Sequence, residues 1–199
     1  YMMELLFLIY KPLDFAKIDE FMDQWNSLAK ENGLPEFLFV GVSSDIKNEY
    51  KSIKEIGISR IVTTDLGTNI FRNRTTLDKI KLKVYRAFYR KAPLIIDYAK
   101  YYPYLTSLLF EFPDLIPSVL PNWDHSPRSG SGATVIENAT PENFEKALRE
   151  AKCFIDRHNL HPLITINSWN EWTETSYLQP DDIFGYGYLE AVKKVFVYE

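Results

Sequence analysis

The segment Leu163–Glu174 reads LITINSWNEWTE, a short apolar strand that passes directly into a loop of tryptophan, asparagine and glutamate side chains. In folds built from parallel strands, the side chains that reach a ligand lie at the carboxyl ends of the strands and in the loops just beyond them. Large aromatic side chains in such a loop must be packed or in use. The segment therefore predicts a parallel α/β fold with a functional site at this strand end.

Strands and helices alternate along the rest of the chain. Short apolar runs predict five strands, at Leu5–Tyr10, Phe37–Val42, Ser59–Thr63, Ser118–Leu120 and Leu163–Asn167. The segments between them carry apolar residues at spacings of three and four, which is the pattern of amphipathic helices. This alternation is typical of βαβ units and a parallel sheet.

Capping residues predict where the two clearest helices begin. The first helix is expected to be capped by Asp14 and to end at Asn32-Gly33, and a later one to be capped by Thr140 with Pro141 in its first position. The inner face of that later helix is predicted to consist of Phe144, Ala147, Leu148, Ala151 and Ile155.

The remaining helical segments are shorter or more polar. Tyr50–Ile56 and Asp78–Arg90 are each predicted to be helical, and a final helix carries Tyr188, Leu189, Val192 and Phe196. Ser129–Gly132 is rich in serine and glycine and lies between a strand and the helix capped by Thr140, so we expect a mobile strand-to-helix loop there.

The number of strand–helix units bears on the architecture. About five units are visible, whereas a complete (β/α)8 barrel of the TIM type needs roughly 250 residues. We therefore expect residues 1–199 to be a single catalytic-type domain that forms the C-terminal part of such a barrel, and a chain that starts at Tyr1 without an initiator methionine agrees with a fragment. An open doubly wound sheet gives the same alternation, but no glycine-rich phosphate-binding turn follows any strand.

The composition excludes several classes of protein. The net charge is −4 and the basic residues are scattered, so a nucleic acid partner is not expected. No apolar run reaches the roughly 20 residues of a membrane-spanning helix. The single cysteine, Cys153, is expected to be a buried small hydrophobe, and a chain without disulfides suits the reducing cytoplasm. The three histidines lie in separate contexts, so we expect neither a metal site nor a cofactor.

Two glutamates in the opening segment, Glu171 and Glu174, are the candidate catalytic residues. Cleavage of a glycosidic bond needs one group that protonates the leaving oxygen and a second that attacks or stabilises the anomeric centre, which is why carboxylates occur in pairs. A small separation of the two carboxyl groups is associated with retention of configuration. An isolated Glu-x-x-Glu would ordinarily be a solvated pair, but two tryptophans and two asparagines directly after a buried strand favour a catalytic role.

Neighbouring strand ends supply the candidate substrate-binding residues. Aromatic rings can stack on the faces of sugar rings, and amide and charged groups can hydrogen-bond sugar hydroxyls. The candidates are Tyr10 after the first strand, Asn122, Trp123, Asp124 and Arg128 after the fourth, and Asn167, Trp169, Asn170, Trp172 and Tyr177 around the two glutamates.

The same segment resembles a known family. Asn170–Glu174, followed by Tyr177–Pro180 and Gly185–Glu190, is similar to the WbsX family, a glycoside hydrolase family 99-like group commonly labelled as glycosyltransferases of bacterial surface-polysaccharide synthesis, including lipopolysaccharide and O-antigen. Leu8–Pro12, Asn122–Arg128 and Thr140–Phe144 resemble further family blocks in the same order, so the resemblance covers essentially the whole chain.

The resemblance implies a (β/α)8 barrel in the bacterial cytoplasm that acts on an α-linked glycan with retention of configuration. By this analogy Glu171 would deprotonate or orient the 2-hydroxyl of the substrate, and Glu174 would be the general acid and then the general base. Two residues depart from the family pattern: Thr175 stands where glycine is usual, and Gln179 stands where glutamate is common. The resemblance also implies that the N-terminal half of the family's barrel lies outside this sequence.

Three classes of function remain open at this point. A retaining site can pass its sugar to water or to another sugar, so a hydrolase and a transferase share the same carboxylates. A non-catalytic glycan-binding module would keep the aromatic residues without the chemistry. A half barrel completed by a partner chain is the third class, because half a barrel leaves an exposed sheet edge. The sequence does not predict an oligomeric state.

Overall fold

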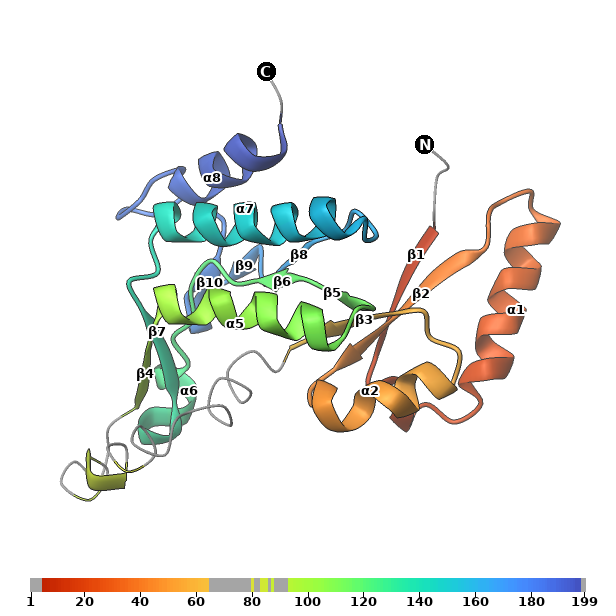
Figure 1. The fold of residues 1–199 in the computed structure, drawn as a ribbon, viewed down its shortest axis with the longest axis horizontal. Helices are drawn as coiled ribbons and strands as arrows, with labels where there is room; N and C mark the ends of the chain where they lie inside the picture. Colours follow the sequence, from red (N-terminus) through yellow and green to blue (C-terminus); the bar gives the residue numbers. More distant parts are fainter. Residues whose placement is uncertain (1–4, 65–79, 81–82, 86, 88–92, 198–199) are drawn as a thin grey trace. The chain divides into compact units, whose positions relative to one another are not determined.

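The computed structural model of the chain describes residues 5–64, 80, 83–85, 87 and 93–197 (Figure 1). It divides into two compact units. The N-terminal unit comprises residues 1–66 and 109–116, and the C-terminal unit comprises residues 67–108 and 117–199. Each unit contains parallel strands of its own.

The N-terminal unit is built on a four-stranded parallel sheet in the order β1-β2-β3-β5. Its strands are β1 (Leu5–Tyr10), β2 (Phe37–Ser43), β3 (Arg60–Thr63) and β5 (Leu115–Ile116). Its helices are the 3₁₀ turn η1 (Pro12–Asp14), α1 (Ile18–Glu31) and α2 (Ile46–Glu55). The three strands predicted for this part of the chain and their parallel pairing are confirmed.

Aromatic packing fixes α1 against the first two strands. The ring of Phe7 on β1 lies 5.5 Å from the rings of both Phe21 and Trp25 on α1, and 6.0 Å from the ring of Phe39 on β2. Such edge-on and tilted pairs stabilise a core beyond the burial of their area. The apolar side of α1 therefore packs against the apolar run of β1.

Asp114 ties the turn before β5 to the rest of this unit. Its carboxylate accepts hydrogen bonds from Tyr50 Oη at 3.0 Å and Arg60 Nη1 at 2.9 Å, and pairs with Lys54 Nζ at 3.0 Å. Partial burial acts to raise the pKa of Asp114, but the hydrogen bonds from Lys54 and Tyr50 and the charges of Lys54 and Arg60 outweigh it and hold that pKa below its ordinary value. The ionised form of Asp114 therefore stabilises the unit.

Two predicted helix starts are wrong. Asp14 does not cap α1, because Pro12 opens a 3₁₀ turn that takes up Asp14, and the chain turns again through Lys17, with φ 61°, before α1 begins at Ile18. The helix predicted over Tyr50–Ile56 is α2, which already begins at Ile46. The predicted helix Asp78–Arg90 lies largely outside the described residues.

The described part of the C-terminal unit contains three strand pairs. Its strands are β4 (Leu94–Asp97), β6 (Ser118–Val119), β7 (Thr134–Glu137), β8 (Thr165–Ile166), β9 (Asn170–Glu171) and β10 (Ser176–Tyr177). Strands β6 and β8 pair in parallel, as do β4 and β7, whereas β9 and β10 form an antiparallel hairpin. Its helices are α5 (Tyr98–Glu111, of which the last three residues belong to the N-terminal unit), α6 (Ser126–Ser129), the 3₁₀ turn η2 (Gly130–Gly132), α7 (Pro141–His158), the 3₁₀ turn η3 (Trp172–Glu174) and α8 (Gly187–Phe196).

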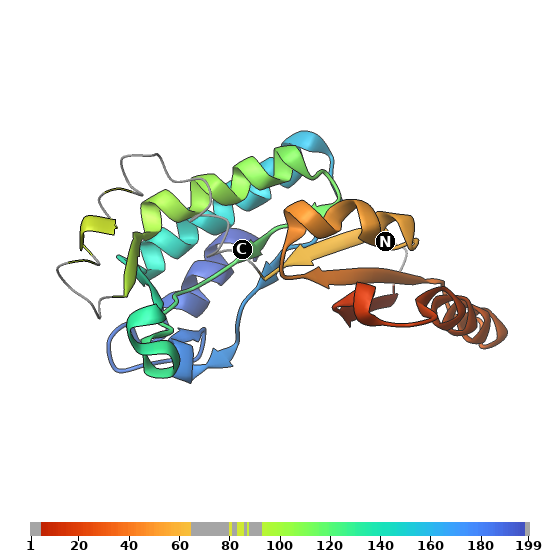
Figure 2. The same cartoon turned by 90° about the horizontal axis from the view of Figure 1, so that it is seen from below.

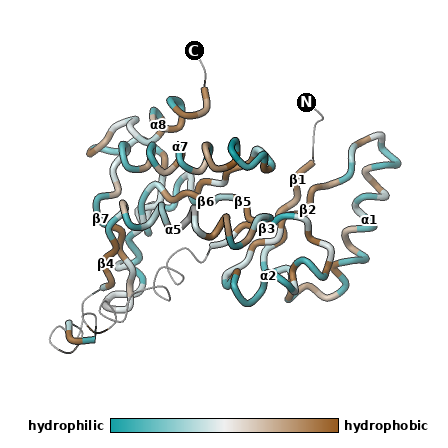
Figure 3. The backbone as a smooth tube through the Cα atoms, in the orientation of Figure 1, coloured by the Kyte–Doolittle hydropathy of each residue, from teal (hydrophilic) through white to brown (hydrophobic). Residues whose placement is uncertain are grey.

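Helices α7 and α8 pack against each other (Figure 1). The Thr140 side chain caps α7 by accepting a hydrogen bond from Asn143 N at 3.3 Å, as predicted. The predicted inner face of α7 is buried, and the alternation of hydrophilic and hydrophobic residues along this helix is visible in Figure 3. From α8, the Tyr188 ring lies 5.6 Å from that of Phe144, and its hydroxyl donates to Ala139 O at 2.7 Å.

Several details of this unit differ from the predictions. Cys153 is exposed, because it lies two positions beyond the buried Ala151 and therefore on the opposite side of α7. Ser129–Gly132 ends α6 and forms η2, and strand β7 lies between it and the Thr140 cap, so this segment does not lead directly into the helix. Strands β4 and β7 and helix α5 were not predicted.

The described strand pairs confirm an α/β fold with parallel strands. The closed barrel and the single catalytic-type domain over residues 1–199 stay predictions. No helix within the described ranges is long and apolar enough to cross a membrane.

Candidate active site

Short hydroxyl side chains hold the loop that follows β8. The peptide bond between Asn167 and Ser168 is cis. Ser176 Oγ donates to Asn167 O at 2.5 Å, and Ser168 Oγ donates to Ser176 O at 2.7 Å while accepting from Glu171 N at 3.2 Å. These bonds fix the start of the β9–β10 hairpin, which carries both candidate catalytic glutamates.

Glu174 is a buried carboxylate with two cationic or potentially cationic neighbours. It ends η3 and is 6% exposed. Its Oε1 atom lies 2.8 Å from Arg128 Nη1 and 3.7 Å from His125 Nε2. The guanidinium side of this pair faces water, because the Arg128 side chain is 65% exposed. A buried carboxylate requires such partners, since removing a lone charge from water is costly.

Thr175, which follows Glu174, stands where the family pattern has glycine. Thr175 adopts a left-handed conformation with φ 53°, which glycine reaches at least cost. Its hydroxyl donates to Glu174 O at 2.8 Å. The loop therefore keeps the conformation that a glycine would favour, although threonine occupies the position.

Glu171 has different surroundings from Glu174. It is half-buried, it directly precedes η3, and its Oε1 atom accepts a hydrogen bond from the Thr173 hydroxyl. The backbone positions of the two glutamates are thus separated by one 3₁₀ turn. One carboxylate is more open to a ligand, and the other is held by a guanidinium.

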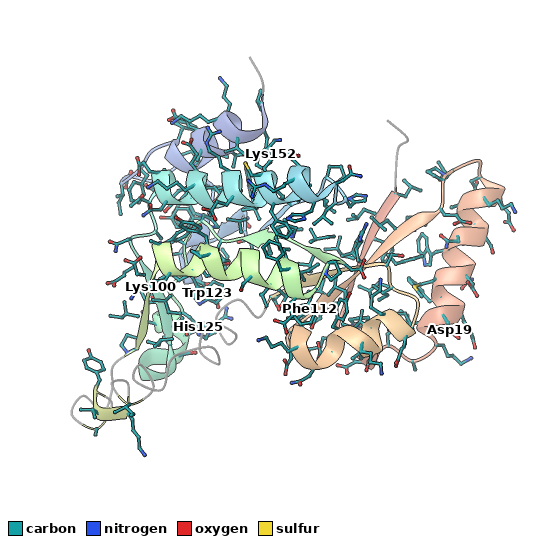
Figure 4. All side chains as sticks on the ribbon, viewed as in Figure 1. Asp19, Lys100, Phe112, Trp123, His125 and Lys152 are labelled. Atoms are coloured by element: carbon teal, nitrogen blue, oxygen red, sulfur yellow. The ribbon has the colours of Figure 1, made fainter. Side chains whose placement is uncertain are left out.

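The loop after β6 reaches Glu174 from the neighbouring strand. Asp124 N donates to Glu174 O at 2.8 Å, and the Trp123 ring lies 5.9 Å from that of His125 (Figure 4). This loop is itself held by β7, because Ile136 N donates to Trp123 O at 2.8 Å. Figure 2 shows α6, which carries Arg128, beside the β9–β10 hairpin.

Two polar candidates of this loop shape the backbone. Asn122 Oδ1 accepts from Trp123 N at 2.7 Å, and Asp124 Oδ1 accepts from Ser126 N at 2.8 Å. These side chains stabilise the turn into α6 and thereby the position of Arg128. Their predicted contact with a substrate stays a prediction.

Aromatic rings dominate the exposed side of the hairpin. The rings of Trp172 and Tyr177 stack with centroids 3.9 Å apart and an interplanar angle of 18°, and Trp172 Nε1 donates to Gln179 Oε1 at 2.6 Å. Burial, followed by the charge and contact of Asp181, raises the pKa of Tyr177 above its ordinary value. Trp169 is 56% exposed, and Asn170 is exposed opposite Tyr177 in the hairpin.

The structure brings nine of the ten predicted substrate-binding residues into the C-terminal unit with both glutamates. They lie on two adjoining segments, the loop and short helix that follow β6 and the loop and hairpin that follow β8. Tyr10 is the exception: it ends β1 in the N-terminal unit and is 69% exposed. Its place beside the glutamates stays a prediction.

Sequence reasoning assigned no role to four residues that shape this site. They are His125, Ser168, Ser176 and Gln179. Their signal in the sequence was weak, because a histidine, two serines and a glutamine are ordinary loop residues until their partners are known. Within the described ranges, no three or more histidine, cysteine, aspartate or glutamate side chains are placed to hold a metal ion.

Carboxylates and exposed aromatic rings at the ends of parallel strands are typical of carbohydrate-active proteins. The chain matches the family model described as Glycosyltransferase WbsX over residues 3–192 and belongs to that family. The description of this family indicates a carbohydrate-related role.

Two curated relatives also match. Both are called uncharacterized protein WxcX and come from two strains of Xanthomonas campestris pv. campestris, and each is 32% identical over 82 residues. The match spans 40% of this chain and 12% of each relative. No solved structure matches the chain significantly.

Proposed function

We propose that the chain is part of a carbohydrate-active enzyme that acts on α-linked sugars of a bacterial surface polysaccharide, with retention of configuration. The observation that carries this proposal is the buried Glu174 carboxylate, one 3₁₀ turn from the more open Glu171. Two carboxyl groups in different surroundings suit two different roles. We further propose that the strands belong to a (β/α)8 barrel located in the bacterial cytoplasm.

The roles of the two glutamates follow from their positions. Glu174 would donate a proton to the glycosidic oxygen as its bond to the anomeric carbon breaks. Glu171 would take the proton of the 2-hydroxyl as that oxygen attacks the anomeric carbon from the opposite side and forms a 1,2-anhydro sugar. In the second half of the reaction Glu174 would take the proton of the incoming hydroxyl as its oxygen bonds to the anomeric carbon, the bond from that carbon to O2 would break, and Glu171 would return its proton to O2. Substrate-assisted routes of this type are established alternatives to a covalent enzyme intermediate.

The contact between Arg128 and Glu174 must open before Glu174 can act as an acid. A guanidinium at 2.8 Å stabilises the ionised carboxylate, whereas an acid must carry a proton. The Arg128 side chain is largely exposed and can leave Glu174 at little cost in packing. We therefore expect a bound glycan to take up the Arg128 guanidinium through its hydroxyls and to free Glu174.

Hydrolase and transferase differ in the acceptor that reaches the anomeric carbon. Membership of a family described as glycosyltransferases favours transfer to a second sugar. The test is incubation of the whole protein with 2-aminobenzamide-labelled α-linked oligosaccharides from bacterial O-polysaccharides, with and without unlabelled acceptor. Mass spectrometry should detect longer products for a transferase or shorter ones for a hydrolase, and proton NMR should show that the first product retains the α configuration. An inverted product would contradict the roles assigned to both glutamates.

The Arg128–Glu174 ion pair also favours a second candidate, a glycan-binding module without catalysis. In that case the guanidinium would hold Glu174 permanently as a structural carboxylate, and the exposed tryptophans would bind the glycan. Titration calorimetry with the same oligosaccharides would then show binding, while long incubation would give no product.

A further inference from the structure

Trp172 is held from two directions. Tyr177 covers one face of its indole ring with the centroids 3.9 Å apart and nearly parallel planes. Its Nε1 atom donates to Gln179 Oε1 at 2.6 Å, in the plane of the ring. Trp172 is nevertheless 48% exposed, and Tyr177 stacks on only one face of its ring.

The support extends beyond Tyr177 and Gln179. Asp181 Oδ1 accepts hydrogen bonds from Ile183 N at 2.7 Å and Phe184 N at 2.5 Å, which fixes the turn before α8. Burial, and then the nearby Asp181 carboxylate, raise the pKa of Tyr177 above its ordinary value. Trp172 therefore stacks on a half-buried tyrosine of the hairpin, near the turn that Asp181 holds before α8.

A fixed tryptophan face is useful for binding, because a side chain that is already ordered loses little conformational entropy when a ligand binds. Trp172 and Glu174 both belong to η3. A sugar ring stacked on the Trp172 indole would therefore be separated from the candidate general acid by a single 3₁₀ turn. The contacts of Trp172 with Tyr177 and Gln179 therefore also fix the distance between a sugar ring stacked on the indole and the Glu174 carboxylate.

The charges around Trp172 and Tyr177 favour a neutral sugar ring over a nucleotide that carries phosphates. Glu171 precedes Trp172, and Asp181 lies against Tyr177; both are carboxylates. Among the described residues, the ring stacking of Trp172 on Tyr177, the hydrogen bond to Gln179 and the charges next to Tyr177 involve no lysine or arginine. These two carboxylates disfavour a phosphate group beside the Trp172 ring, whereas the CH face of a neutral pyranose meets no such repulsion, and the nearby cation Arg128 is paired with Glu174. A nucleotide base with its phosphates is therefore a poor fit.

We propose that Gln179 is a positioning residue which, with Tyr177, holds the Trp172 indole as a preformed stacking surface for a neutral pyranose of the glycan chain, and not for the nucleotide of an activated sugar. This inference rests on the proposed function for the identity of the ligand. It goes beyond it by naming a residue and by assigning this surface to the glycan.

The test compares Gln179→Leu with Gln179→Glu in the whole protein. Glutamate keeps an oxygen that accepts from the indole and should preserve the stacking surface, whereas leucine keeps the size but removes the acceptor. Gln24→Leu on α1 is the matched control, because Gln24 is exposed in the other unit. The Trp172 indole N–H resonance, assigned with Trp172→Phe, should shift and exchange faster in Gln179→Leu only.

Binding and turnover then decide the role. With the labelled α-linked oligosaccharides, Gln179→Leu should weaken binding and raise KM roughly 3- to 10-fold while kcat changes less than about twofold. Gln179→Glu should restore wild-type binding, and uridine monophosphate should not compete. Unchanged oligosaccharide binding in Gln179→Leu, a loss confined to kcat, or competition by uridine monophosphate would each overturn the proposal. If glycan binding depends on Gln179 but the wild type gives no product, the proposed role of the stacking surface is supported and the enzymatic proposal is contradicted.

Discussion

Gly187, the first residue of α8, is predicted to be intolerant of even one added carbon. A Cβ atom built at this position would lie 2.8 Å from Cγ and 3.2 Å from Cβ of Pro141, which begins α7. The proline ring is rigid and is anchored in the first turn of a capped helix, so α8 itself would have to shift.

Two opposing effects decide the size of the change. Overpacking of this kind costs about 1–3 kcal/mol, whereas replacing glycine by alanine in a helix gains at most about 1 kcal/mol, and less at its first position. The net destabilisation of Gly187→Ala should therefore be about 1–2 kcal/mol. For a chain of this length, that corresponds to a fall in Tm of roughly 2–8 °C.

The assay is thermal and urea unfolding followed by circular dichroism. The matched control is Gly132→Ala, because a Cβ at Gly132 meets nothing within 4 Å and its φ is not positive. That control should be neutral or slightly stabilising, since alanine restricts the unfolded chain. A Gly187→Ala protein as stable as the wild type would show that α8 does not pack against Pro141 as described.

Two further predictions concern stability. Asp114→Asn should remove on the order of 1 kcal/mol at neutral pH, because the depressed pKa of Asp114 means that its ionised form stabilises the fold above about pH 4 and that this contribution is lost as the pH falls through the lower folded-state pKa. Urea unfolding at about pH 7 and pH 3 should therefore show a smaller pH dependence in Asp114→Asn than in the wild type or in Asp23→Asn, and equal pH dependence would argue against the network. Thr140→Ala should cost about 1 kcal/mol through loss of the α7 cap, and an unchanged urea midpoint would mean that the bond to Asn143 N contributes nothing.

The elements that could be predicted from the sequence are those with continuous signals. Strands β1 and β2 are uninterrupted apolar runs, and α7 combines a threonine cap, a proline in the first position and a regular apolar stripe. Strand β7 was missed because its four residues, Thr134–Glu137, bury only one side chain fully. Asp14 was predicted to cap α1, but it does not, because Pro12 opens a separate 3₁₀ turn that includes Asp14.

The candidate site was predictable in its residue types but not in its contacts. Tryptophans and glutamates after an apolar strand indicated chemistry at Glu171 and Glu174. The contact between Arg128 and Glu174 joins residues far apart in the sequence, and it depends on the pairing of β6 with β8. The exposure of Cys153 and the bond from Trp172 to Gln179 likewise follow from packing that no local pattern reveals.

The role of Glu174 is tested most directly by turnover of the Glu174→Gln variant on the labelled α-linked oligosaccharides. Glutamine keeps the shape of the side chain and an oxygen for Arg128, but it carries no transferable proton, so the rate should fall roughly 10²- to 10⁴-fold with the fold intact by circular dichroism. Glu150→Gln, at an exposed position of α7, should react as fast as the wild type. Wild-type turnover in Glu174→Gln would contradict the assignment of this carboxylate as the general acid and base.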